Sequence, residues 1–422
     1  MTAIVVMLAG LLHAAAASAG CPVSKAEFRA ILAELTARPN IPPRLMPASQ
    51  AAGDRDALKA CGMPRRELQF SVPQRLPDQA GLPSRFRIDH QRLPILSDAG
   101  SRSRGAVFAI AGRFAVNADA APRAYHPLDP FGRCTGKGKD RICALDALCN
   151  AGVRIFRGKT EIKCQDRDAY SAAWKEMWGL ISERKARPIP RRYWRLDRTR
   201  TTNTHYGFFH PDKSLTVIMR HNIIPHDRNL RPCVRDVAGT RFAGYFVSKT
   251  SLRGNQGADE AEGPAAADIV KDHRCNPLPY ANPEVLRGVV IPVGGFAGAK
   301  VGDLAVIYRK APGGPDRFVY AVVSDQGPNH AFGEGSIALN AALKGIAPNV
   351  NSIADLYRLD ISSKDDGKER IGVLILRGTA GVLDNLSQAS IDAAVAKAFQ
   401  SWGGGSADKA KQRFMACMAA LR

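Results

Sequence analysis

The chain has 422 residues, of which 45% are hydrophobic, and it carries a formal net charge of +21 from 60 Lys/Arg against 39 Asp/Glu. This length and apolar content predict one large globular domain or two moderate ones, and they exclude an intrinsically disordered chain. The charge favours partners that are themselves anionic.

The first segment has the character of an export signal. Residues 1–19 are apolar, rich in small residues and end in Ala-Ser-Ala, although the usual basic start is missing. We therefore expect a bacterial protein that is secreted or periplasmic; the alternative for this segment is a buried N-terminal helix. Cys21 follows Ser-Ala-Gly, so a lipid anchor at Cys21 is a second alternative. No later segment has 18 uncharged apolar residues, so no transmembrane segment is expected after signal removal.

Nine cysteines in an exported chain predict disulfide bonds. Four of them lie close together, at Cys134, Cys143, Cys149 and Cys164. Their spacing fits no common zinc pattern and no Cys-x-x-Cys pair occurs, which favours stapled loops over a metal site. Four histidines between His205 and His226 also lack the spacing of a helical metal motif. We expect no metal and no cofactor.

Residues 20–104 are expected to form a short helix, Val23–Ala37, followed by a proline-rich arm. From Arg65 to Arg104 proline recurs with little hydrophobic periodicity, which is typical of an extended segment rather than a packed domain. The main domain is expected over residues 105–380, beginning with a strand over Ala106–Val116 that a glycine interrupts.

A basic insert is expected over about residues 164–229, with a helix over Asp168–Lys185. Ile181–Arg241 holds 14 Lys/Arg against five Asp/Glu, and Tyr193 and Trp194 stand between arginines. Such a segment could hold a polyanion or stack on sugar rings. The alternative is a solvated basic face. No nucleic-acid motif is present, so no nucleic-acid partner is expected.

Short apolar runs dominate the second half of the chain and predict a barrel or a sandwich. The six runs are Leu215–Met219, Gly244–Val247, Val289–Val293, Leu304–Tyr308, Phe318–Val323 and Ile371–Leu376. Residues 381–422 are expected to be helical, with one helix capped by Ser390 and ended by Gly403, and a last helix over Ala407–Leu421. The predicted fold class is mainly β, with a six-stranded β-barrel core, a helical insert and C-terminal helices.

The most informative stretch is Val319–Leu339. An apolar strand ends at Asp325 in a Gly/Pro corner, and Glu334 follows between two glycines. Two carboxyl groups that face one cleft are the minimum equipment for cleaving a glycosidic bond, since one protonates the leaving oxygen and the other activates water or attacks carbon. The alternative is that Asp325 forms a turn and Glu334 caps a helix.

Four ordered segments between Gly105 and Gly378 resemble glycoside hydrolase family 75, the fungal-type chitosanases. Their strand-end Ser-Asp and Gly-Glu-x-Ser-Ile-x-Leu signature matches Ser324-Asp325 and Gly333–Leu339. The other three matches are Asn117–Pro127 (NADAAPRAYHP), Ala144–Gly152 (ALDALCNAG) and Gly244–Leu252 (GYFVSKTSL). The Ser-Asp-x-Gly-Pro turn also resembles the double-psi β-barrels of some lytic transglycosylases and expansin-like proteins, which makes the expected barrel double-psi-like.

The resemblance implies an extracellular, inverting endo-hydrolase of β-1,4-linked aminosugar chains that needs no metal. The paired acids of the family match Asp325 and Glu334; we assign Glu334 as general acid and Asp325 as base, and the reverse assignment stays open. Substrate contacts are expected from the matched elements and from His330, which lies between the two acids. The predicted substrate-binding residues are Asp119, Tyr125, His126, Ser248, His330 and Ser336.

The charge of the chain conflicts with chitosan, whose amines are positive. Peptidoglycan has carboxylates on a β-1,4 aminosugar backbone and suits a basic exported protein better. The alternatives are therefore a peptidoglycan-cleaving enzyme similar to lytic transglycosylases and a non-catalytic, expansin-like protein that binds the cell wall.

Overall fold

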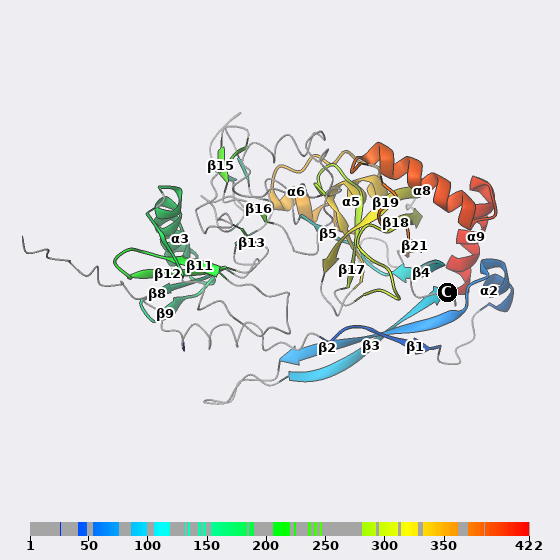
Figure 1. The fold of residues 1–422 in the computed structure, drawn as a ribbon, viewed down its shortest axis with the longest axis horizontal. Helices are drawn as coiled ribbons and strands as arrows, with labels where there is room; N and C mark the ends of the chain where they lie inside the picture. The colour runs from blue at the N-terminus through cyan, green and yellow to red at the C-terminus, as the bar shows by residue number, and fades with distance from the viewer. Residues whose placement is uncertain are drawn as a thin grey trace, which may run out of the picture.

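The computed structural model describes most of the chain and is shown in Figure 1. The described residues are 26, 41–48, 54–75, 86–98, 105–118, 131, 134–135, 142–143, 145, 147–148, 153–183, 185–189, 206–219, 223–224, 235–237, 240–242, 245–246, 281–292, 295–310, 314–327, 332–361, 370–383 and 385–421. The predicted signal, Cys21, the helix over Val23–Ala37 apart from Ala26, and the Tyr193–Trp194 pair lie outside these residues.

The protein is mainly β, as predicted, and its centre is a ten-stranded mixed sheet. The strands follow one another in the order β1-β2-β3-β4-β21-β18-β19-β17-β20-β5. Their bounds are β1 Arg44–Pro47, β2 Arg65–Arg75, β3 Phe86–Ser97, β4 Gly105–Ala111, β21 Ile371–Arg377, β18 Leu304–Lys310, β19 Asp316–Gly327, β17 Gly288–Pro292, β20 Glu334–Ser336 and β5 Ala115–Asn117.

The middle strands are buried on both faces, which explains why they are continuous apolar runs rather than alternating ones. All seven residues of β21 are buried. Val373 and Ile375 pack into a core with Val289 and Val323 inside the curl of the sheet. Leu374 and its neighbours on the other face pack against helices α8 (Gln388–Trp402) and α9 (Ala407–Ala420).

The sheet curls strongly because β4 and β5 are joined by residues 112–114 alone, although they stand fourth and tenth in the strand order. Phe114 bridges Ile361, and the amide of Ala115 donates to the carbonyl of Gly333, so the far edge returns beside β4. Gly112 provides the predicted glycine break between these strands. No strand ladder among the described residues closes the curl, so the closed barrel stays a prediction.

Two of the six predicted barrel strands lie outside this sheet, and that part of the prediction was wrong. Leu215–Met219 is strand β12 of a five-stranded sheet, in the order β10-β11-β12-β8-β9. Tyr245–Phe246 forms β16 and pairs with β13 (Ile223–Ile224). An apolar run predicts a strand, but the sheet to which it belongs depends on partners distant in sequence.

The described part of the predicted insert, residues 164–229, contributes one helix and three strands to a unit built on the five-stranded sheet, and the other two strands, β8 and β9, precede residue 164. The strands are β8 Arg154–Arg157, β9 Thr160–Ile162, β10 Arg187–Pro188 and β11 Tyr206–Phe209 beside β12, and the helix is α3 (Arg167–Ser182). Tyr170 and Trp174 of α3 are buried in a core with Ile155 and Val217 of the sheet. Cys164, one of the four clustered cysteines, is disulfide-bonded, as expected for a stapled loop. Two further small sheets pair β6 (Cys134–Thr135) with β7 (Ile142–Cys143) and β14 (Arg235–Val237) with β15 (Thr240–Phe242).

The proline-rich arm is a long β-hairpin that belongs to the large sheet. Strands β2 and β3 pair along their whole length, although they contain Pro73 and Pro94. Proline is tolerated where a strand is paired on one side alone. Strand β1 reaches only Arg66–Gln69 of β2, and β4 reaches only Ile95–Ser97 of β3, so both prolines lie where the second side has no ladder.

The C-terminal segment is helical, as predicted, with one difference. Ser387 rather than Ser390 caps α8, because its side chain accepts the amide of Ser390. The helix ends before Gly403, whose virtual Cβ would lie 2.1 Å from the Cα of Ala410 in α9. This close approach lets the two helices pack together over the sheet. The remaining helices are α2 (Arg55–Cys61), α5 (Ile337–Lys344) and α6 (Ile353–Tyr357).

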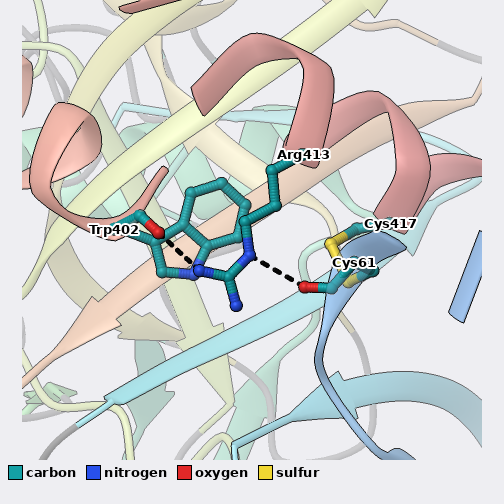
Figure 2. The surroundings of a disulfide bond; sticks show 4 residues. All are labelled: Cys61, Trp402, Arg413 and Cys417. Carbon is teal, nitrogen blue, oxygen red and sulfur yellow. Dashed lines mark hydrogen bonds between the residues drawn. A yellow bond between two sulfur atoms is a disulfide. The ribbon is translucent and has the colours of Figure 1, made fainter. Parts of the chain in front are cut away.

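A disulfide bond joins the N-terminal part of the fold to its last helix. Cys61 at the end of α2 is bonded to Cys417 in α9 (Figure 2). Arg413 supports this junction: its guanidinium lies over the Trp402 ring, 4.4 Å from the ring centroid, and donates to the carbonyls of Trp402 and Cys61. None of the helices in the described parts of the chain has both the length and the apolar character that spanning a membrane requires.

Removing this disulfide should destabilise the protein without changing its fold. We expect the double variant Cys61→Ser/Cys417→Ser to lose about 2–5 kcal/mol of unfolding free energy, because the bond closes a long loop in the unfolded chain. Denaturant unfolding followed by circular dichroism measures this loss. Wild-type protein treated with a reductant should unfold at a denaturant concentration no higher than that of the variant, because the reductant also breaks the disulfide of Cys164. Equal midpoints for oxidised wild type and variant would contradict the prediction.

Candidate active site

The two predicted acids lie in one row across the large sheet. In the strand register, Val290 of β17 pairs with Asp325 of β19 on one side and with Glu334 of β20 on the other. Residues paired across neighbouring strands point to the same face, so both carboxylates stand on one face with Val290 between them. Sequence reasoning gave the two residues, and the register brings them together.

Glu334 leans across this row toward the strand that carries Asp325. A Cβ built on Gly327 would lie 2.8 Å from Oε2 of Glu334 and 2.9 Å from Cγ1 of Val290. Gly327 stands two residues beyond Asp325 on the same face, a step of about 7 Å along a strand. The Glu334 carboxylate therefore lies beside Gly327, on the face of the sheet that also carries Asp325.

A β-bulge turns two consecutive polar residues to the same side. The register between β17 and β19 shifts between Val289 and Val290, because Val289 pairs with Val323 and Val290 with Asp325. Ser324 is the extra residue, and its side chain lies over Gly288, where a Cβ would come within 2.1 Å of its Oγ. Bulges of this kind re-aim side chains and are frequent beside active sites.

Asp325 borders a small cavity. The residue is 5% exposed, and its carboxylate accepts the amide of Gln326 at 2.7 Å. The cavity has about 10 Å³ of space for the centre of a water molecule. It is lined by four polar residues, Asn117, Ser324, Asp325 and Ser336, and by four apolar ones, Ala281, Pro283, Leu286 and Val290.

Ser336 has a structural role in this arrangement. Its hydroxyl donates to the carbonyl of Leu286 and accepts the amides of Gly288 and Leu339. These bonds cap α5 and tie the cavity wall to β17, and they use the full capacity of a hydroxyl group. In the structure the Ser336 oxygen has these three partners. The predicted contact of Ser336 with substrate stays a prediction.

Helix α8 holds the same wall from the other side. The amide of Arg287 donates to Oε1 of Gln388, and the Arg287 guanidinium is 2.7 Å from Asp392. Segment 281–288 is thereby fixed at both β20 and α8 before it enters β17. The cavity wall is rigid for this reason, although it is not itself regular secondary structure.

The other predicted substrate-binding residues lie outside the described part of the chain. They are Asp119, Tyr125, His126, Ser248 and His330. In the described residues, no three His, Cys, Asp or Glu side chains are grouped as a metal site requires. His210, one of the four histidines considered above, lies 2.5 Å from Asp212 in the turn between β11 and β12.

Asn117 and Ser324 were missed as candidate functional residues. Asn117 ends β5 beside Ser336 of β20, and it stands at the start of the first family-like segment. The signal available in the sequence was the same one that revealed Asp325: a polar residue directly after a short apolar strand. In a comparison with known proteins, no family model matches this chain, and a search of curated proteins gave no match.

Proposed function

We propose that the protein is an exported glycoside hydrolase that cleaves β-1,4-linked aminosugar polysaccharide by an inverting mechanism. The observation that supports this most is the row Asp325–Val290–Glu334 across three neighbouring strands. It sets two carboxylates on one face of the sheet, which is the arrangement that a general acid and a general base require.

In this proposal Glu334 is the general acid and Asp325 the general base. The Glu334 side chain is partly exposed and reaches over Gly327, where it can protonate a leaving glycosidic oxygen. Asp325 is buried beside the cavity, where it can take a proton from water. The apolar body of Val290 forms the floor between them.

The proposal extends to the architecture of the catalytic domain, residues 105–380. Six neighbouring strands, β4, β21, β18, β19, β17 and β20, would form the barrel, with β5 completing the curl. Its double-psi-like character is supported by two parallel pairs in an otherwise antiparallel sheet, β17 with β19 and β20 with β5. The export signal over residues 1–19 places the enzyme outside the cytoplasm in this proposal.

The net charge of +21 favours an anionic polymer and is the reason to keep peptidoglycan beside chitosan as substrate. The same charge supports the second candidate, a non-catalytic protein that binds the cell wall. The two functions differ in whether glycosidic bonds are broken.

A sugar-release assay separates them. Purified protein is incubated with chitosan, peptidoglycan and, as a neutral β-1,4 control, cellulose, and new reducing ends are measured. We expect release from one or both aminosugar polymers and none from cellulose, with the α-anomer as first product by NMR because inversion converts the β-linkage. Binding to cell walls without release from any polymer would reject the hydrolase and support the second candidate.

A further inference from the structure

We propose that the cavity beside Asp325 holds the attacking water molecule, and that Asn117 and Ser324 are the positioning residues that orient it. This inference rests on the proposed function and adds two residues to its site. Neither residue was expected from the sequence, and both come from the geometry around Asp325.

The size of the cavity selects its occupant. About 10 Å³ of space for a water centre corresponds to one water molecule and is too small for a sugar ring. A buried water needs two to four polar partners. Asp325, Asn117 and Ser324 line the cavity, and their side chains carry a carboxylate, an amide and a hydroxyl.

The fourth polar residue of the lining shapes the wall. The Ser336 hydroxyl bonds three backbone groups, as described above, which uses its full hydrogen-bonding capacity. The bulge turns Ser324 toward Gly288. Because Gly288 has no side chain, the Ser324 side chain has room to lie there. The bulge therefore places the proposed base, Asp325, and the positioning residue Ser324 on the same side of the sheet.

The apolar half of the lining supports the same assignment. The side chains of Ala281, Pro283, Leu286 and Val290 offer no hydrogen bonds, so among the lining side chains the polar ones alone can orient a water. Its position and lone pairs are then fixed before substrate arrives. Such preorganisation lowers the entropic cost of the attack.

The hydrolytic step exchanges one bond at the anomeric carbon for another. The water oxygen forms a bond to the anomeric carbon while the glycosidic C–O bond breaks with its electron pair going to the leaving oxygen. Glu334 gives its proton to that oxygen, and Asp325 receives the proton lost by the water. Proton exchange with solvent restores both carboxyl groups.

Three variants test the proposal: Asn117→Ala and Ser324→Ala, which remove the partners, and Ala281→Val, which fills the cavity from its apolar side. We expect kcat to fall about 10²-fold in each while KM changes less than twofold, because the sugar contacts are untouched. Val285→Ala is the matched control, since Val285 lies in the same wall segment but its side chain is 60% exposed. It should retain wild-type kcat and KM.

A second substrate distinguishes a role in positioning the water from a role in assisting the general acid. An aryl glycoside with a good leaving group needs little protonation, so Glu334→Gln should regain activity on it, whereas Asn117→Ala and Ser324→Ala should not. Near-wild-type kcat in both of these variants, or a loss confined to KM, would overturn the inference while leaving the hydrolase proposal intact. If the wild type releases no sugar at all, the proposed function fails and this inference fails with it.

Discussion

Asp325→Asn and Glu334→Gln should each lower kcat for polysaccharide cleavage by about 10³-fold, the typical contribution of a general acid or base. Both replacements keep the shape of the side chain and remove the ability to donate or accept the required proton. Asparagine fits the buried site of Asp325, where the amide of Gln326 finds an oxygen acceptor in either residue. The rate of appearance of reducing ends measures the loss.

A control must show that the loss of activity does not come from misfolding. Asp316→Asn is a suitable control, because Asp316 is an exposed acid at the opposite end of the same strand. Its activity should equal that of wild type, and all three variants should show the wild-type thermal midpoint within a few degrees. Full activity in either active-site variant would refute the two-carboxylate mechanism, and unchanged wall binding in both, with no cleavage by wild type, would favour the binding protein.

The two candidate acids could be chosen from the sequence because their signal is local. Glu334 begins β20 between two glycines and Asp325 lies two residues before the end of β19 at Gly327, so a few neighbouring residues are enough to suggest a functional corner. The cavity could not be predicted in the same way. Its lining combines Asn117, Ala281, Ser324 and Ser336, whose proximity depends on the pairing of β5 with β20 and of β17 with β19.

The fold, too, could be predicted where it depends on neighbouring residues and could not where it depends on residues distant in sequence. The apolar runs that became β17, β18, β19 and β21, and the C-terminal helices, follow from periodicity within a few residues. The hairpin β2–β3 was hidden by its prolines, since their tolerance depends on which side of each strand is paired. The separate sheet of β12 was hidden because its ladder joins it to β8 and β11.

Gly327→Ala should lower kcat by about 10³-fold, although residue 327 takes no part in the chemistry. The backbone of Gly327 is not in the left-handed region, so alanine is compatible with its conformation and the fold should persist. The new methyl group would, however, lie 2.8 Å from the Glu334 carboxylate and 2.9 Å from Val290. The carboxylate is the end of a flexible side chain and must move away from its place opposite Asp325. A displacement of about 1 Å costs on the order of 10²-fold in rate, and the loss is expected to approach that of removing the acid.

The control for this substitution is Gly112→Ala, where the same methyl group meets nothing within 4 Å. Gly112 lies in the link between β4 and β5, and its variant should keep both activity and stability. If the Gly327 variant fails through a displaced Glu334, an aryl glycoside with a good leaving group should restore much of its rate, as it does for Glu334→Gln. Normal activity of the Gly327 variant on polysaccharide would show that the position of the Glu334 carboxylate beside Gly327 is not the one used in catalysis. A large loss of thermal stability would instead attribute the effect to the contact with Val290, so the midpoint of unfolding is measured on the same samples as kcat.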